Sequence, residues 1–289
     1  MLSYNKDFFQ ESKCIIVQND RFFIDICFWG CGSGCSYCYA PKHNEKQCLL
    51  NLEQIKCICE YIKSRYDCHQ KIISLCPNTE PLKSKQSISL VLYIIDFFRK
   101  QDCYIQISTK EIIPSYFLDE IKHISNSKIY INISIPMITN SDVVEPNAAT
   151  YSNRFNNFKL INYYSDINFC LYIKPLIQIQ QDQETYVKNI NFYNISKVII
   201  GPTFDKNAEI PCVSLYDKND ANKILQTQSD YMDGFIKLLR SKTKAQVYGS
   251  SVCVIYNDFK KHCVLKLSQF IKSACEDCSL LEECNYGKI

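Results

Sequence analysis

Three cysteines stand close together in one short segment of the chain. Cys31, Cys35 and Cys38 have the spacing Cys-x3-Cys-x2-Cys. Thiolate sulfur suits both zinc and iron–sulfur clusters. Three thiolates can hold a four-iron cluster and leave one iron without a protein ligand. The alternative is a zinc site completed by Cys27, but Cys27 lies in an apolar run that predicts a strand, where its side chain belongs to one face of the sheet.

Glycines mark the same segment. The chain has only 7 glycines, and three of them, Gly30, Gly32 and Gly34, alternate through five positions. Glycine adopts backbone angles that other residues avoid. We therefore expect an unusual backbone conformation around the cysteines.

The composition narrows the class of protein. Of the 289 residues, 46% are hydrophobic, 22% charged and 13% aromatic, which excludes a disordered or low-complexity chain. A net charge of +3 is too small to predict a nucleic-acid groove or an anionic membrane surface. The chain has 18 cysteines, which we expect to be thiols or metal ligands in a reducing compartment. No apolar run reaches the roughly 20 residues of a membrane span, and Met1 to Asp7 lack the features of a signal peptide, so we expect a cytoplasmic protein.

Short apolar runs alternate with amphipathic stretches, and this order predicts parallel strands connected by helices. The expected strands are Arg21 to Phe28, Lys71 to Cys76, Tyr104 to Ser108, Lys128 to Ile135, Asn168 to Lys174 and Lys197 to Ile200. The expected helices are Leu52 to Arg65, Ser87 to Lys100, Pro114 to Ile124, Arg154 to Tyr164, Glu184 to Tyr193 and Ser229 to Arg240. Six such units are fewer than the eight of a closed barrel. We predict an α/β fold, a partial (β/α)6 TIM-like barrel, whose chemistry lies at the carboxyl ends of its strands.

The pattern changes after residue 240. We predict a strand at Ser251 to Tyr256 and a helix at His262 to Ser273, followed by a cysteine-rich tail. The expected organisation is a barrel domain over residues 1–240 and a small cysteine-rich extension over residues 241–289.

The cysteine loop and its position after the first strand resemble the radical S-adenosylmethionine (radical SAM) superfamily. The resemblance covers roughly Arg21 to Pro202, and the segment Gly30 to Ala40 is typical of the branch that contains spore photoproduct lyase. It implies that Cys31, Cys35 and Cys38 hold a [4Fe–4S] cluster whose open iron binds SAM. It also implies reductive cleavage of SAM to a 5′-deoxyadenosyl radical, which abstracts hydrogen from a substrate.

The resemblance further implies a set of cofactor-binding residues. Its members either follow a predicted strand or belong to the cysteine motif, and they are Tyr37, Glu80, Ser108, Lys110, Ser134 and Arg154. Tyr37 is expected near the adenine, Glu80 at the ammonium group of SAM and Lys110 at its carboxylate. Arg154, with the segment Glu145 to Ala148, is expected to orient the ribose or carboxylate, and an ion pair at a helix end is the alternative.

Cys76 closes the second predicted strand. Spore photoproduct lyase holds a cysteine close to this place that returns a hydrogen atom to the product radical, so the resemblance makes Cys76 a candidate catalytic residue. A buried, inert cysteine is the alternative. The glycine-rich motif that many members of the superfamily carry on the fifth strand is missing from Ile173 to Gln178.

A second group of cysteines lies near the end of the chain. Cys275, Cys278 and Cys284 have the spacing Cys-x2-Cys-x5-Cys, which resembles part of the auxiliary iron–sulfur modules of peptide-modifying radical SAM enzymes. We expect an auxiliary [4Fe–4S] cluster with Cys263 as the fourth ligand, or with Cys253 in its place. A structural zinc site is the alternative.

Together these features predict a radical SAM enzyme that acts on a peptide or a small molecule. The first alternative is an enzyme like spore photoproduct lyase that acts on nucleic acid. The second is a zinc-stabilised binding protein without redox chemistry. The predicted enzyme needs an electron donor such as flavodoxin or ferredoxin, and we expect no membrane partner.

Overall fold

The structure is a computed structural model. It describes residues 14–18, 21–38, 46–123, 128–137, 141–176, 183–201 and 221–259, except for the side chains of residues 141 and 221–231. Among these residues, no helix is both long and apolar enough to cross a membrane.

One eight-stranded sheet forms the centre of the molecule. Its strands are β1 (Ile15–Val17), β2 (Arg21–Ile24), β5 (Ile72–Leu75), β6 (Tyr104–Thr109), β7 (Ile129–Ser134), β8 (Ile167–Ile173), β9 (Lys197–Ile200) and β10 (Gln246–Tyr248). They are arranged in the order β1-β2-β5-β6-β7-β8-β9-β10, and every neighbouring pair is parallel except β1 with β2. The six predicted strands therefore lie side by side in chain order, which confirms the partial barrel of parallel strands.

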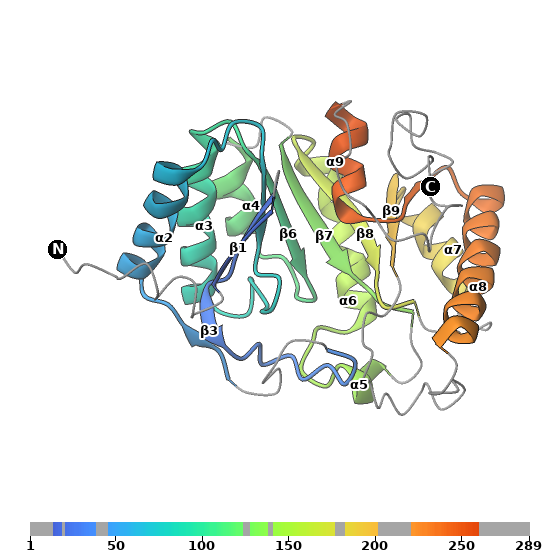
Figure 1. Ribbon diagram of the computed structural model, residues 1–289. Helices are drawn as coiled ribbons and strands as arrows, with labels where there is room; N and C mark the ends of the chain where they lie inside the picture. Colours follow the sequence, from blue (N-terminus) through green and yellow to red (C-terminus); the bar gives the residue numbers. More distant parts are fainter. Residues whose placement is uncertain are drawn as a thin grey trace.

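Helices follow the strands, and most of them cover the outer face of the sheet (Figure 1). They are α2 (Leu52–Arg65), α3 (Lys85–Arg99), α4 (Ser115–Lys122), α5 (Ser141–Val144), α6 (Tyr151–Asn156), a 3-10 helix (Asn157–Tyr163), α7 (Gln183–Phe192), α8 (Ala221–Lys242) and α9 (Ser251–Phe259). Sequence explains where α2 begins, because the side chains of Asn51 and Gln54 each accept a hydrogen bond from the backbone N–H of the other. Its buried residues Ile55, Ile58 and Ile62 recur every three or four positions and so face the sheet.

The strands divide their side chains between two environments. On β6, for example, Ile105 and Ile107 belong to the large apolar core under the helices. Tyr104 and Gln106 alternate with them and point to the inside of the barrel. Full burial of one such isoleucine stabilises the fold by about 1.5–3 kcal/mol, so the outer core fixes the strand register.

The helix α9 closes the inside of the barrel at the amino ends of the strands. It packs on a smaller apolar core that includes Tyr104 and Tyr130, and Phe259 lies 4.5 Å from the Tyr104 ring. Figure 1 shows α9 at the end of the sheet away from the strand arrowheads. The predicted strand at Ser251 to Tyr256 is therefore wrong. Val252, Ile255, Tyr256 and Phe259 have helical spacing, and this one face lies against the barrel interior.

Two further elements differ from the sequence expectation. The predicted strand Arg21 to Phe28 divides into β2 and β3 (Cys27–Trp29), and β3 leaves the main sheet to pair with β4 (Cys48–Leu49). The break lies at Asp25, whose backbone N–H donates to the carbonyl of Cys14. β10 lies beyond residue 240 and yet extends the barrel sheet beside β9. A separate module over the cysteine-rich tail stays a prediction, since residues 260–289 lie outside the described residues.

Candidate functional site

We use the name carboxyl rim for the loops after β3, β5, β6 and β7, namely residues 30–38, 76–84, 110–114 and 145–150. Figure 1 shows β3 and α5 at this end of the sheet, beside the strand arrowheads. Parallel strands bring these loops together from distant parts of the sequence.

The backbone of the cysteine loop has the unusual conformation that the sequence predicts. Gly30, Gly32 and Gly34 have φ angles of 78°, 73° and 67°. A side chain at such an angle costs roughly 1–2 kcal/mol. The alternating glycines therefore let the chain turn tightly and present the cysteine side chains between them.

The three thiols of the loop differ in burial. Cys35 is buried, whereas Cys31 and Cys38 are half-buried. Cys35 Sγ donates a hydrogen bond of 3.9 Å to Glu145 Oε1, and Cys31 Sγ donates one of 3.4 Å to the hydroxyl of Ser33. Burial raises the pKa of Cys35 to about 12, and the Lys110 charge opposes that rise.

The described residues do not form the four-thiol zinc site. Cys27 Sγ donates to the carbonyl of Gly30 at 3.3 Å, and its pKa is raised to about 12, mainly by burial. Within the described ranges, no three His, Cys, Asp or Glu side chains converge on a single metal ion. A four-iron cluster needs less convergence, because each thiolate binds a different iron.

Glu145 is the acceptor at the centre of the site. It accepts hydrogen bonds from the Tyr37 hydroxyl, from Cys35 and, at 2.7 Å, from Arg154 Nη2. Glu145 and Arg154 form an ion pair whose side chains are 0% and 1% exposed. Arg154 also donates to the carbonyls of Ser134 at 2.9 Å and Ala149 at 2.6 Å. This geometry favours the ion-pair alternative for Arg154, which holds the Glu145 carboxylate in place.

Glu80 is buried in the loop after β5. Its Oε1 accepts from the Thr109 hydroxyl at 2.5 Å and its Oε2 from the backbone N–H of Lys110 at 2.8 Å. Burial raises the pKa of Glu80, and the Thr109 hydrogen bond opposes the rise. The neighbouring Thr79 donates to the carbonyl of Gly30 at 3.1 Å and so ties this loop to the cysteine loop.

Lys110 and the two predicted serines lie at the ends of β6 and β7. The Lys110 ammonium lies 5.8 Å from the centre of the Tyr37 ring. Burial lowers the pKa of Lys110, but Cys35, Glu145 and Glu80 raise it more, so Lys110 keeps its charge. Ser108 accepts from Asn132 Nδ2 at 3.1 Å, and Ser134 is buried at the end of β7.

The segment after β7 joins these parts. The carbonyl of Val144 accepts from the N–H of Ser36 at 2.9 Å, and the N–H of Asn147 donates to the carbonyl of Ser33 at 3.3 Å. The N–H of Ala149 donates to the carbonyl of Lys110 at 3.1 Å. The predicted residues on the cysteine loop, β6 and β7 are thus held in one hydrogen-bonded assembly.

Cys76 lies directly after β5, with a φ angle of 56° that only a few non-glycine residues adopt. Its side chain is buried, and burial raises its pKa well above the usual range. Asp25 is the second contributor to that rise. Its own Oδ2 accepts from the backbone N–H of Asn78 at 3.3 Å, while its buried Oδ1 has no hydrogen-bond partner. Burial raises the pKa of Asp25 to about 7.

Cations line the inside of the barrel below the rim. Arg21 donates from Nε to Ser74 at 2.5 Å and from Nη2 to Gln106 at 2.6 Å. Lys174 follows β8, and burial together with the charges of Arg21 and Lys110 lowers its pKa to about 8. A side chain on Gly201 would come within 3.0 Å of Lys174 Cδ, so this glycine makes room for the lysine.

Sequence reasoning missed three residues of the site, namely Arg21, Asp25 and Lys174. Each had a signal, because a charged residue within or directly after an apolar strand of a buried sheet needs a partner or a function. The metal ligands predicted for the second site, Cys263, Cys275, Cys278 and Cys284, lie outside the described residues. Cys253, the alternative to Cys263 as fourth ligand, lies on α9 at the amino ends of the strands.

The residues present fit a [4Fe–4S] cluster with SAM. The donor set is three thiols in a loop that supplies no fourth cysteine, and burial of Cys35 calls for a cationic partner to balance thiolate charge. Buried carboxylates at Glu80 and Glu145 and the ammonium of Lys110 lie on the same rim. Such groups match the ammonium and carboxylate of an amino acid.

Comparisons with known proteins agree with this architecture. No protein-family model matches the chain, and no curated protein sequence matches it. Among solved structures, spore photoproduct lyase complexed with dinucleoside spore photoproduct is 14% identical, with a TM-score of 0.56 over 76% of this chain and 74% of that one. A mutant of that lyase with bound AdoMet and the dinucleoside is 15% identical, with a TM-score of 0.59 over 79% and 76%. The enzyme anSMEcpe with bound AdoMet is 12% identical, with a TM-score of 0.52 over 75% and 60%. The chain thus has the fold of these radical SAM enzymes.

Proposed function

We propose that the protein is a radical SAM enzyme whose reaction takes place at the carboxyl rim. The observation that carries this proposal is the loop of Cys31, Cys35 and Cys38, held by three left-handed glycines over the ends of parallel strands. The likeness in fold to spore photoproduct lyase and anSMEcpe supports it. In this proposal, the three thiolates hold a [4Fe–4S] cluster, which supplies the electron that cleaves SAM to a 5′-deoxyadenosyl radical.

The chain's own residues bind and orient SAM in this proposal. The Lys110 ammonium is available to the SAM carboxylate, since the charges around it keep it protonated. Glu80 binds the SAM ammonium, with Ser108 and Ser134 as further polar contacts. Tyr37 lies on the adenine side, and Arg154 fixes Glu145 beneath it. Cys76 is the proposed hydrogen-atom donor to the product radical, because its thiol stays protonated in its buried position.

The substrate class that we propose is a peptide or a small molecule. The positive charges of Arg21, Lys110 and Lys174 inside the barrel favour a substrate that carries an anionic group. These charges, with the dinucleoside bound by a structural neighbour, also support the second candidate, a nucleic-acid substrate. Salt-dependent retention on immobilised DNA separates the two, because phosphate contacts weaken steeply with salt.

The Lys174→Met variant tests the anionic class directly. The expected result is a raised KM for an anionic substrate with little change in SAM cleavage in the absence of substrate. Lys188→Met, on the exposed face of α7, is the matched control. Equal KM values in the two variants would exclude Lys174 from substrate binding.

Iron content and SAM cleavage test the proposed function itself. Anaerobic reconstitution is expected to give about eight irons per chain if Cys263, Cys275, Cys278 and Cys284 hold an auxiliary cluster, and about four if only the loop does. The reduced protein should release 5′-deoxyadenosine from SAM, with flavodoxin or ferredoxin as the proposed donor in the cytoplasm. Cys35→Ala should abolish that release. A protein that binds zinc and no iron would support the alternative, a zinc-stabilised binding protein.

A further inference from the structure

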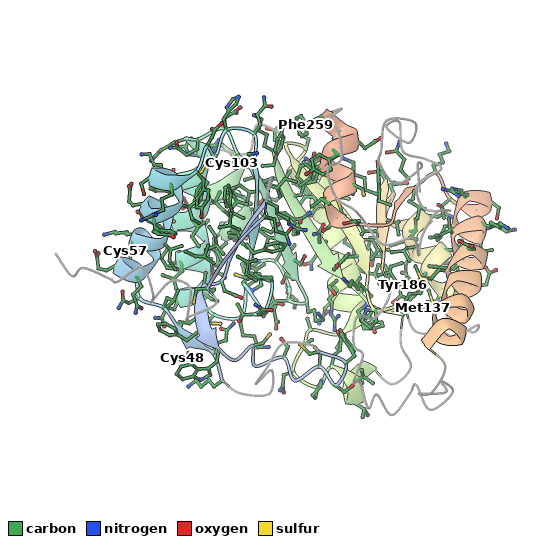
Figure 2. The ribbon with its side chains drawn as sticks, viewed as in Figure 1. Cys48, Cys57, Cys103, Met137, Tyr186 and Phe259 are labelled. Carbon is green, nitrogen blue, oxygen red and sulfur yellow. The ribbon has the colours of Figure 1, made fainter. Side chains whose placement is uncertain are left out.

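A pair of cysteines lies at the opposite end of the barrel. We use the name amino rim for residues 66–71, which precede β5, and residues 100–103, which precede β6. The N–H of Gln70 donates to the carbonyl of Asp102 at 3.1 Å, and the N–H of Tyr104 donates to the carbonyl of Lys71 at 2.9 Å. Figure 2 shows Cys103 at the end of the sheet away from Cys48, which lies on β4. The two loops are therefore fixed against each other by backbone bonds.

The side chains of Cys68 and Cys103 meet between these loops. Cys103 Sγ donates to the carbonyl of Cys68 at 3.1 Å, and Cys68 Sγ donates to the carbonyl of Tyr66 at 3.5 Å. The interaction between the two thiols lowers the pKa of Cys68 and raises the pKa of Cys103. Cys59 and Cys170 differ, because burial is the largest cause of their raised pKa values. Cys68 is thus the nucleophilic member of a pair, and Cys103 is the protonated member.

A cavity of about 470 Å³ lies beside Cys68, the member of the pair that lines it. Cys68 lines it together with Lys63, Tyr66, Asp67, His69, Lys100, Gln101 and Asp102. Cys68 is 5% exposed and Cys103 is 2% exposed, so this opening suits a small oxidant better than a bulky disulfide. Of the charged groups near the Cys68 thiol, Lys71 lowers its pKa and Asp67 raises it.

We propose that Cys68 and Cys103 form a second thiol site, which a small peroxide such as hydrogen peroxide oxidises to a disulfide. The Cys68 thiol loses its proton, the thiolate attacks one peroxide oxygen, the O–O bond breaks, and the hydroxide that leaves takes up the Cys68 proton to form water. The sulfenic acid formed on Cys68 is then attacked by Cys103 Sγ. The S–O bond breaks, the S–S bond forms, and the released oxygen takes the Cys103 proton and leaves as water. Overall, two thiols and one hydrogen peroxide give one disulfide and two waters.

Differential alkylation of the full chain tests the proposal. The protein is purified without oxygen, treated with increasing hydrogen peroxide, alkylated, digested and mapped by mass spectrometry. The expected result is a linked pair of peptides that contain Cys68 and Cys103, formed at lower peroxide than oxidation of Cys59 or Cys170. A reductant such as dithiothreitol should reverse it. The proposal is overturned if both thiols remain alkylatable when Cys59 has been oxidised.

Three variants separate the two roles. Cys103→Ser should stop the reaction at the sulfenic acid of Cys68, which a 1,3-diketone probe traps, and Cys68→Ser should leave Cys103 reduced. Cys57→Ser, on the half-buried side of α2, is the control and should form the link like the wild type. Equal diketone labelling of Cys103→Ser and Cys68→Ser would refute the assignment. The wild-type map needs no variant and no SAM cleavage, so a failure to fold or the failure of the proposed function leaves the test intact.

Discussion

The two rims of the barrel both carry thiols in loops with left-handed backbone, but they achieve that backbone differently. In the cysteine loop of the carboxyl rim, glycine supplies it at positions 30, 32 and 34, and Cys76, with a φ angle of 56°, is the exception on that rim. At the amino rim, Gln70 and Asp102 adopt φ angles of 55° and 59° although they have side chains. The Asp102 carboxylate accepts from Lys128 and lies 3.6 Å from His69 Nδ1. A strained residue is retained where its side chain makes contacts, whereas the cysteine loop uses glycine and keeps the space between its thiols open.

The rims also differ in where they keep their charges. The Glu145–Arg154 pair of the carboxyl rim is fully buried, whereas His69 and Asp102 of the amino rim are 63% and 47% exposed. Buried charges depend strongly on their partners, while exposed pairs contribute little. Substitution of a charged residue should therefore reduce stability more at the carboxyl rim than at the amino rim.

Removal of a buried partner gives the largest expected effect. Arg154→Met leaves Glu145 without its cation, and we expect the free energy of unfolding to fall by about 4 kcal/mol. Urea denaturation measures the change. Lys122→Met, which breaks the exposed Lys122–Asp119 pair on α4, should cost less than about 1 kcal/mol. Similar losses in the two variants would contradict the contrast between buried and exposed charge.

The buried carboxyl of Asp25 gives the next effect, and it depends on pH. Its pKa is raised from 3.8 to about 7, so the folded state holds the proton more tightly than the unfolded state. The stability from this group is complete below pH 3.8 and is lost as the pH rises through 7. The free energy of unfolding of Asp25→Asn should therefore rise relative to that of the wild type as the pH rises, by about 3 kcal/mol at pH 8.

Urea midpoints at pH 5 and pH 8 measure this gain. Glu60→Gln, on the exposed side of α2, is the control and should change stability by no more than about 0.5 kcal/mol at either pH. If the stability difference between Asp25→Asn and the wild type were the same at both pH values, Asp25 would not titrate between them.

Oxidation of Cys68 and Cys103 to a disulfide should stabilise the protein at its amino rim. A disulfide between Cys68 and Cys103 closes a loop of 35 residues that contains α3. Loop closure restricts the unfolded chain, and we expect a gain of about 2–3 kcal/mol after allowance for strain. Thermal unfolding of peroxide-treated protein, with and without dithiothreitol, measures it. The Cys103→Ser variant should show no such gain, and an equal gain there would place its origin elsewhere.

Backbone substitutions give the smallest effects and compare the rims directly. Gly32→Ala should cost about 1–2 kcal/mol for its left-handed backbone. The new Cβ would not clash with a neighbouring side chain, since it would lie 4.0 Å from Lys83 Cε. Gln70→Gly relieves strain but adds freedom to the unfolded chain, and it should change stability by less than about 1 kcal/mol. Chemical denaturation of both variants decides whether the two rims use left-handed residues for different reasons.

The sequence predicted the strands because their apolar runs are short and bounded by proline or polar residues. It also predicted the glycine conformation, since three of seven glycines fell in one loop. It failed at α9, where valine and isoleucine indicated a strand. The helical spacing of Val252, Ile255 and Phe259 has meaning only once the aromatic residues inside the barrel are known to need a cover.

The site was predicted in its residues more than in their contacts. The cysteine motif indicated Cys35 and Tyr37, but their common neighbour Glu145 lies more than one hundred positions away from both. Asp25 and Lys174 were missed because single charged residues in apolar strands have no motif. Their importance comes from burial, which only the packed sheet shows.

The cover that α9 places on the barrel also bears on kinetics. Because the described interior is packed with aromatic and aliphatic side chains at its amino end, we expect ligands to enter the barrel from the carboxyl rim. Entry from one end predicts an ordered mechanism, in which the molecule that binds deeper in the barrel binds first and is released last. Steady-state inhibition by product should then be competitive toward one reactant and non-competitive toward the other.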